Sequence, residues 1–271
     1  MRIFIRTSKW AIWARRLGSL AVPLTVLPVL LHRERLIDSP AFIVVALFAA
    51  ALSVLAIFVS LVALARLWHT GDQGWGRALM GLLLGSLCLA PFAWYGALAL
   101  KYPAVTDIAT SARGDLPLVF EPAMLDMPPP RLLSDAERQL FFPNVATRTY
   151  PLGAVQLFAL VDNLVAAQGW DIRLREEPDG MGGAGRLNAR IVTPPGWREE
   201  AVFRVTPIPD GAAVDMRSAS LNAVTDFGSN GNRISAFLVA LDNEVTAFLR
   251  DNPNLDQPLD VEAPAPVETD R

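Results

Sequence analysis

The residue types best suited to chemistry gather in one stretch, residues 217–234, which reads RSASLNAVTDFGSNGNRI. Its two arginines suit an anionic ligand, because the guanidinium fork matches carboxylate and phosphate groups. Asp226 is a candidate general base. A serine nucleophile would lack its usual partner here, since His32 and His69 both lie among the first 100 residues and no lysine follows Lys101. The stretch therefore favours structural capping or ligand contact over catalysis, and no catalytic residue is assigned.

This stretch stands between a predicted strand and the last predicted helix. A helix start exposes backbone N–H groups and a partial positive charge, which can hold an anion. Asp226, Ser229 or Asn230 could instead accept those N–H groups as an N-cap, and Gly228 and Gly231 allow turns with positive φ. Both uses of the helix start stay open. The candidate binding residues are Arg217, Ser218, Ser220, Asp226, Gly228, Asn230 and Arg233, with Asp107 and Thr110 from an earlier segment.

The elements around this stretch follow two hydrophobic periodicities. Apolar residues at helical spacing fill 152–168 and again 234–249. Short connections between the strands imply an antiparallel sheet, and one apolar stripe per helix implies that both helices pack on one face. The prediction is an α+β domain over residues 149–250. Its strands, where polar and apolar residues alternate, are expected over 170–175, 187–193, 201–206 and 212–220.

Several arginines fall on the strand face that points away from the predicted core. With Trp170, Ile172 and Leu174 turned inward, alternation turns the residues between them outward. Such a face could cradle an anionic group. It could also be a solvated face with cross-strand ion pairs worth about 0.2–1 kcal/mol each, and we favour this second interpretation. The outward set is Asp171, Arg173, Arg175, Asn188, Arg190, Arg204, Thr206, Asp215 and Arg217.

The first 101 residues are too apolar for a water-soluble domain. The whole chain is 19% charged, below the roughly 25% typical of soluble domains. Residues 39–65 and 78–100 contain no charged residue, and each run is long enough to cross a hydrocarbon core about 30 Å thick as a helix. The uncharged run 17–31 is shorter and contains two prolines, so that a cleaved signal peptide is the competing interpretation. We predict a transmembrane region over 1–101, with spans at about 10–31, 39–67 and 77–101.

Positive charges set the expected orientation of these spans. Residues 1–16 carry five basic residues, and the loop 66–77 carries two more on the same side. The opposite loop, 32–38, carries two arginines diluted by two acids. The N-terminus is therefore expected in the cytoplasm of a bacterial cell. Three spans of the inner membrane then place the C-terminal domain in the periplasm.

Two further segments flank the predicted domain. The proline density over 102–148 predicts an extended arm, with one short helix near Ser134, which has capping-box spacing to Glu137. The proline- and acid-rich residues 251–271 predict a disordered tail.

The amino-acid composition also limits which cofactors and binding partners the chain can have. The single cysteine, Cys88, excludes an intrachain disulfide, and no metal or cofactor is expected. The net charge of −3 gives no indication of a nucleic-acid partner, which would need clustered basic residues. The expected partners are the lipid bilayer and an envelope protein or an anionic small ligand.

Residues 217–234 resemble the signature of the DUF1499 family of unknown function, which typically reads R-S-x-S-x-x-G-x-S-D-x-G-x-N-x-x-R-I. Ala223 stands where the family usually has Gly, and Thr225 stands where it has Ser. Residues 105–110, VTDIAT, are similar to an early I-N-D-I-S-T segment of the family. The resemblance covers about 104–250 and implies a domain of bacterial envelope and plastid proteins, often behind N-terminal spans, with no established activity. The matching residues are Arg217, Ser218, Ser220, Asp226, Gly228, Asn230, Arg233 and Ile234.

Two functions of different classes remain open. The favoured one is an inner-membrane protein that presents a periplasmic α+β domain and binds a ligand or envelope partner through residues 217–233, with Asp107 and Thr110 beside them. The alternative is a hydrolase or transferase in which Asp226 acts as base and an arginine of the stretch stabilises charge. The state of Asp226 discriminates between them. Closed to solvent and paired, it is structural; open in a deep pocket with a raised pKa, it favours catalysis.

Overall fold

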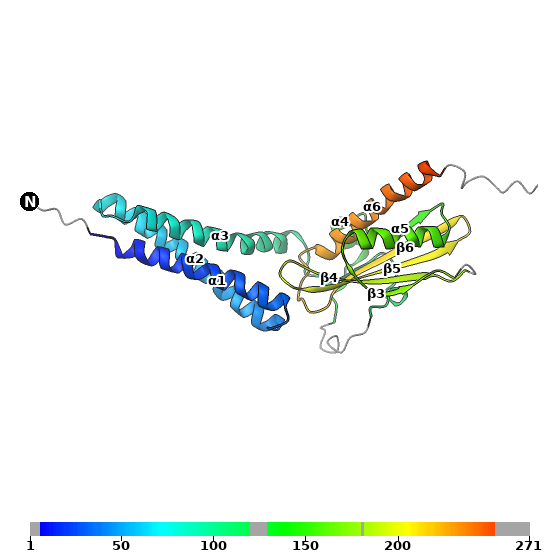
Figure 1. Cartoon of the computed structure of the whole chain (residues 1–271), viewed down its shortest axis with the longest axis horizontal. Coiled ribbons are helices and arrows are strands. Elements are labelled where there is room, and N and C mark those ends of the chain that lie inside the picture. Colours follow the sequence, from blue (N-terminus) through cyan, green and yellow to red (C-terminus); the bar gives the residue numbers. More distant parts are fainter. Residues whose placement is uncertain (1–5, 120–128, 180–181, 253–271) are drawn as a thin grey trace, which may run out of the picture.

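The computed structural model describes residues 6–119, 129–179 and 182–252. The predicted disordered tail lies outside these ranges from residue 253 on. Three long helices are followed by a sheet that carries further helices on one face (Figure 1). The predicted α+β class with three apolar N-terminal helices is confirmed.

The three N-terminal helices are α1 (Lys9–Arg33), α2 (Ser39–Thr70) and α3 (Trp75–Lys101). Each is long and apolar enough to cross a membrane. α2 begins where the Asp38 carboxylate accepts the Ala41 N–H at 3.0 Å, and it ends at Gly71 with φ of +66°. Because the helices run back and forth, the N-terminus and the C-terminal domain lie at opposite ends of the bundle (Figure 1).

Small residues let these helices approach closely. A Cβ placed on Gly81 of α3 would lie 2.5 Å from the backbone of Ala14 in α1, and one on Gly18 would lie 3.0 Å from Gly81. Ser53 and Ser60 satisfy their hydroxyls within α2, by donating to Ala49 and Ala56 carbonyls. Close backbone packing of this kind is typical of helix association in lipid, where van der Waals contact replaces the hydrophobic effect.

The domain is built on an antiparallel sheet in the order β1-β6-β5-β4-β3, with β2 also paired to β6. All four strands expected from alternation are present. Two three-residue strands were not predicted, because they are too short to show a period and lie in the proline-rich segment. The strands are β1 (Asp107–Ala109), β2 (Arg148–Tyr150), β3 (Asp171–Glu176), β4 (Gly185–Val192), β5 (Arg198–Ile208) and β6 (Gly211–Ser220).

Helices α5 (Ala154–Ala167) and α6 (Ser229–Asp251) cover one face of the sheet, as expected (Figure 1). The main hydrophobic core lies between these two helices and the sheet. It includes the buried side chains of Leu157 in α5, Phe203 in β5 and Leu238 in α6. The short helix α4 (Asp135–Phe141) starts at the predicted capping box, in which Ser134 and Glu137 exchange hydrogen bonds. After β1, a short 3₁₀ turn (Arg113–Asp115) leads Leu116 onto the opposite face of the sheet, against Ala109 and Val202.

A bulge in β3 overturns part of the predicted strand faces. Ile172 pairs with Ala189, whereas Leu174 pairs with Asn188, so that one residue of β4 opposes two of β3. Each extra residue exchanges the two faces of a strand. Arg175 therefore lies on the helix-covered face, where its Nη2 donates to the Asp162 carboxylate of α5 at 2.7 Å. The expectation that Arg175 points outward and Leu174 inward was wrong for this reason.

One end of the domain packs directly on the three N-terminal helices. In α3, the Tyr95 ring lies 5.2 Å from the Phe227 ring of the loop before α6. At the end of α1, the His32 ring stacks on Phe42 at 4.5 Å and meets the Trp197 ring edge-on at 4.8 Å. His32 Nδ1 also lies 2.8 Å from the Pro195 carbonyl oxygen, which can only accept, so this nitrogen carries the proton. These contacts, here called the junction, hold the membrane-facing end of the sheet against the ends of α1 and α3.

Candidate functional site

Strand alternation divides the candidate residues between the two faces of the sheet. Along β6, Ser218 and Ser220 point to the helix-covered face, and Arg217 points to the opposite face. In β1, Asp107 lies opposite Ala219 and therefore shares the face of Arg217. The residues expected to form one surface thus belong to two separate polar clusters.

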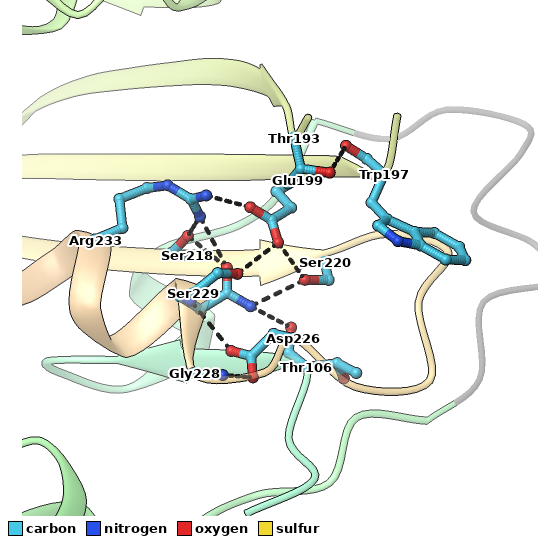
Figure 2. A network of polar contacts seen from close by, with 11 residues as sticks. Thr106, Thr193, Trp197, Glu199, Ser218, Ser220, Asp226, Gly228, Ser229 and Arg233 are labelled. Atoms are coloured by element: carbon cyan, nitrogen blue, oxygen red, sulfur yellow. Dashed lines mark hydrogen bonds and ion pairs between the residues drawn. The ribbon is translucent and has the colours of Figure 1, made fainter. Parts of the chain in front are cut away.

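The helix-side cluster centres on Glu199 of β5 (Figure 2). Its carboxylate forms an ion pair with Arg233 of α6 and accepts hydrogen bonds from Ser220 and Ser229 hydroxyls at 2.9 and 2.8 Å. The same arginine donates to the Ser218 hydroxyl at 2.8 Å. We call these five residues, with Asn230, the Glu199 network.

Asn230 joins the remaining groups of the network. Its Oδ1 accepts from Ser218 at 2.7 Å, and its Nδ2 donates to Ser220 Oγ at 3.0 Å and to the Thr106 carbonyl at 3.2 Å. The side chains of Glu199 and Arg233 are only 3% and 14% exposed. Buried charges are tolerated only when they are paired and fully hydrogen-bonded. The network meets that condition and ties the start of α6 to β5, β6 and the segment before β1.

Asp226 lies beside the network and caps α6 from two residues before the N-cap position. Its Oδ1 accepts the Gly228 N–H at 2.9 Å and its Oδ2 accepts the Asn230 N–H at 3.2 Å. It is 5% exposed. Burial raises the pKa of Asp226 to about 6, although the two backbone hydrogen bonds oppose that rise; the charge of Glu199 adds to it. The capping interpretation of Asp226 agrees with this geometry, and neither Arg217 nor Arg233 pairs with it.

We expect Asp226→Asn to flatten the pH dependence of stability between pH 4 and 6. A carboxyl whose folded pKa is raised stabilises the fold below its unfolded pKa, and this contribution is lost as pH rises through the folded value. A pKa raised from 3.8 to about 6 corresponds to a free-energy difference of about 3 kcal/mol. Between pH 3.5 and 7 the wild type should therefore lose about 3 kcal/mol of stability relative to the variant. Chemical denaturation of the detergent-solubilised chain at each pH measures the difference. Parallel profiles for the two proteins would refute the raised pKa.

The two glycines of the stretch serve different purposes. Gly228 has φ of +81°, and a Cβ there would lie 2.6 Å from the ring of Tyr102. Gly231 lies inside α6 and does not have the positive φ that was expected. It is required instead because a Cβ would lie 2.3 Å from the Phe142 ring. Both glycines therefore admit an aromatic ring against the start of α6.

The second cluster lies on the opposite face and centres on Asp107 and Arg217. Arg217 donates through Nε and Nη2 to the two carboxylate oxygens of Asp107, at 3.0 and 2.8 Å, and through Nη1 to the Leu116 carbonyl at 2.8 Å. Arg113 adds a further ion pair to Asp107 at 3.0 Å. Such a bidentate pair is the strongest arginine–carboxylate geometry. Together with the bond to Leu116, this pair holds the segment after β1 against the face of the sheet opposite the helices.

The sequence placed Asp215 and Asn188 on that face, but it did not single out Glu200. Asp215 accepts from the Thr110 and Thr147 hydroxyls at 2.9 and 2.5 Å. Glu200 accepts from Asn188 Nδ2 at 2.6 Å and from the Val119 N–H at 2.8 Å. The pair Glu199-Glu200 was the available signal, because two adjacent acids in a central strand must each find a partner on opposite faces.

The arginines of the opposite face are mostly matched with acids. Arg204 pairs with Asp115 at 3.1 Å, Arg173 pairs with Asp171 at 3.4 Å, and Arg186 pairs with Glu176 at 3.3 Å. The expected ion pairs are present, although of these three pairs only Arg186–Glu176 joins two strands. The expectation that this face is solvated was wrong near Asp107 and Arg217, which are buried beneath the segment after β1.

Arg190 faces both the carboxylate of Glu200 and a second positive charge, that of Arg35. Burial lowers the pKa of Arg190, the charge of Arg35 in the α1–α2 loop lowers it further, and Glu200 opposes both effects. Arg35 is exposed and has φ of 61°. Arg33 is close by, since a Cβ on Gly196 of the β4–β5 turn would lie 2.9 Å from its backbone. The corner between α1 and α2 therefore lies against the β4–β5 turn, and it brings the charge of Arg35 near Arg190 and Glu200.

The described residues contain no group of three or more His, Cys, Asp or Glu that could hold a metal ion. In the Glu199 network, the serine hydroxyls donate to acceptors within the network. Both oxygens of Asp226 accept backbone N–H groups. The arrangement is chemically suited to holding elements together, because Glu199, the carboxylate that accepts from the Ser220 and Ser229 hydroxyls, is buried and ion-paired with Arg233.

Comparison with known proteins supports the resemblance in the sequence. The model of the family described as protein of unknown function (DUF1499) matches residues 126–241. The matched range contains β2 to β6, α4, α5 and the first half of α6, and with them the Glu199 network. A search among curated proteins found no match.

Proposed function

Because residues 126–241 match a family without a known activity, we propose a function from the geometry: the protein is a membrane-anchored binding module that holds an anionic ligand at the junction. In this proposal the chain lies in a bacterial inner membrane with its N-terminus in the cytoplasm, and the α+β domain presents the ligand site on the periplasmic side. The observation that carries the proposal is the contact of His32 with the Pro195 carbonyl at 2.8 Å, which holds the end of α1 against the β4–β5 turn and so brings Arg35 near Arg190.

Glu200 offsets part of the positive charge at this point, and an anion beside Arg35 would offset more of it, because like charges repel each other. Arginine is the residue best suited to such an anion, because its donors match phosphate and carboxylate oxygens. The loop that carries Arg33 and Arg35 is held to the sheet by the contacts of His32 with Pro195 and Trp197. A binding site assembled from two such fixed elements needs little ordering when a ligand arrives.

The state of the Glu199 network and Asp226 supports binding over catalysis. Asp226 has the raised pKa expected of a general base, but both of its oxygens are used as a helix cap and the side chain is buried. Arg233 is engaged by Glu199 and Ser218. A hydrolase or transferase at this loop would need these groups to face a substrate.

Anion binding is tested with the full chain in a neutral detergent and inorganic pyrophosphate as the probe. We expect pyrophosphate to raise the thermal unfolding temperature, since a ligand that binds only the folded state stabilises it. Arg35→Gln should weaken the apparent affinity about tenfold, which corresponds to one charge-assisted hydrogen bond.

The matched control is Arg204→Gln, which removes an arginine of the same sheet that already pairs with Asp115. It should retain the wild-type response. Equal responses of the Arg35→Gln and Arg204→Gln variants, or no response of the wild type to pyrophosphate and to citrate, would contradict the proposal.

A further inference from the structure

A second basic site lies at the other end of the helical bundle. Arg15 and Arg16 of α1 and Arg77 of α3 line a hollow of about 340 Å³, together with Ile12 and Ser19. The four α1 residues are spaced i, i+3, i+4 and i+7, which places them on one face of the helix. Arg77 lines the hollow from the start of α3, so that arginines from two helices face the same space.

The lining contains no acidic side chain. Among the residues that the structure describes, none of the three arginines forms an ion pair with an acid; Arg16 lies over the Trp13 ring at 5.6 Å. All three arginines are exposed to the surroundings of the bundle. Three neighbouring positive charges without an acid repel one another and favour an external anion.

The position of the hollow relative to the bilayer determines which anion can reach it. The uncharged run that follows Arg16 in α1 comprises residues 17–31, and at 1.5 Å per residue it spans only about 22 Å. This is less than the hydrocarbon core of about 30 Å. Arg15 and Arg16 are therefore drawn to the depth of the lipid phosphates, where long basic side chains extend toward the interface.

We propose that Arg15, Arg16 and Arg77 form a binding site for the phosphodiester headgroup of an anionic phospholipid, in the leaflet on the N-terminal side of the membrane. Basic pockets between membrane helices recognise anionic headgroups in this way. Ser19 adds a hydroxyl donor, and Ile12 an apolar side chain where the acyl chains begin. The site is separate from the junction, and it does not depend on the anion site proposed there.

The test uses the full chain, purified in a neutral detergent, with added lipid of defined headgroup. Phosphatidylglycerol should raise the thermal unfolding temperature and stay bound in native mass spectrometry, whereas phosphatidylcholine with the same acyl chains should do neither. The double variant Arg15→Gln/Arg77→Gln should bind phosphatidylglycerol at least about tenfold more weakly. Arg6→Gln is the matched control, because it removes an exposed positive charge near the same end but outside the hollow.

Further measurements distinguish a loss of lipid binding from misfolding and from binding of a free phosphate. Arg15→Lys/Arg77→Lys keeps the charges and should retain part of the binding. The Gln variant should keep the wild-type unfolding temperature in the absence of lipid, which shows that it is folded. Free glycerol 3-phosphate should not compete at millimolar concentration, because it lacks the acyl chains. Equal binding of both lipids, equal binding by the Arg15→Gln/Arg77→Gln and Arg6→Gln variants, or full competition by glycerol phosphate would each overturn the lipid site. None of these results bears on the response of Arg35 to pyrophosphate.

Discussion

Replacement of Glu199 by alanine is expected to destabilise the domain by about 3–5 kcal/mol, the range found when one partner of a buried ion pair is removed. The variant leaves the Arg233 guanidinium largely buried without its acid, and it takes the acceptor from the Ser220 and Ser229 hydroxyls. Hydrogen exchange of the detergent-solubilised chain measures this loss as faster exchange in β5, β6 and the first turns of α6. The membrane helices should keep their protection.

The matched control is Glu244→Ala, which removes an exposed acid from α6. It should change the stability by less than about 0.5 kcal/mol. The double variant Glu199→Met/Arg233→Met should cost less than the sum of its single changes, because it leaves no buried charge unpaired. Unchanged exchange in Glu199→Ala would mean that the Glu199 network does not hold α6 to the sheet.

The second large effect is expected for Arg217→Met, at about 3 kcal/mol. The change leaves the Asp107 carboxylate 2% exposed, with Arg113 as its remaining partner, and removes the donor from the Leu116 carbonyl. We expect the segment after β1 to detach, seen as rapid exchange over residues 107–118.

Arg204→Met provides the comparison for this prediction. Its ion pair with Asp115 is partly exposed, at 32% and 53% for the two side chains, and surface pairs contribute about 0.2–1 kcal/mol. If both variants lower the stability by the same small amount, Arg217 does not hold the segment after β1 to the sheet. Its place in the signature would then have to be explained by a ligand.

Much of the fold could be predicted from the sequence because long periodic patterns carry it. The uncharged runs in α2 and α3 admit only membrane helices or a fully buried core, and the alternation over β4, β5 and β6 admits only strands. The capping box of α4 was readable from Ser134 and Glu137 because it depends on two residues at fixed spacing.

The remainder depends on contacts between distant residues. The bulge in β3 comes from pairing with β4, and residues 170–175 alternate regularly without any sign of it. The strands β1 and β2 are only three residues each and exist because β6 offers them hydrogen-bonding edges.

The contacts of the candidate site could likewise be predicted only in part from the sequence. The signature marked Ser218, Ser220, Asn230 and Arg233 correctly as a group. Glu199, which pairs with Arg233 and accepts from Ser220, stands in another strand and outside the signature. Arg217 and Asp107 were expected beside that group. Since neighbouring residues of a strand point to opposite faces, they lie instead on the other side of the sheet.

The proposed function requires three membrane spans between the basic N-terminal end and the domain, with the domain on the periplasmic side. The most direct measurement labels single cysteines in intact bacterial cells with a maleimide that does not cross the inner membrane. Cys88→Ser provides the background. Asp210→Cys reports on the turn between β5 and β6, and Gln73→Cys reports on the α2–α3 loop; both positions are exposed. We expect Asp210→Cys to be labelled in cells whose outer membrane alone is permeabilised, and Gln73→Cys only after lysis. The reverse pattern, or labelling of both positions only after lysis, would contradict this topology and the periplasmic ligand site that depends on it.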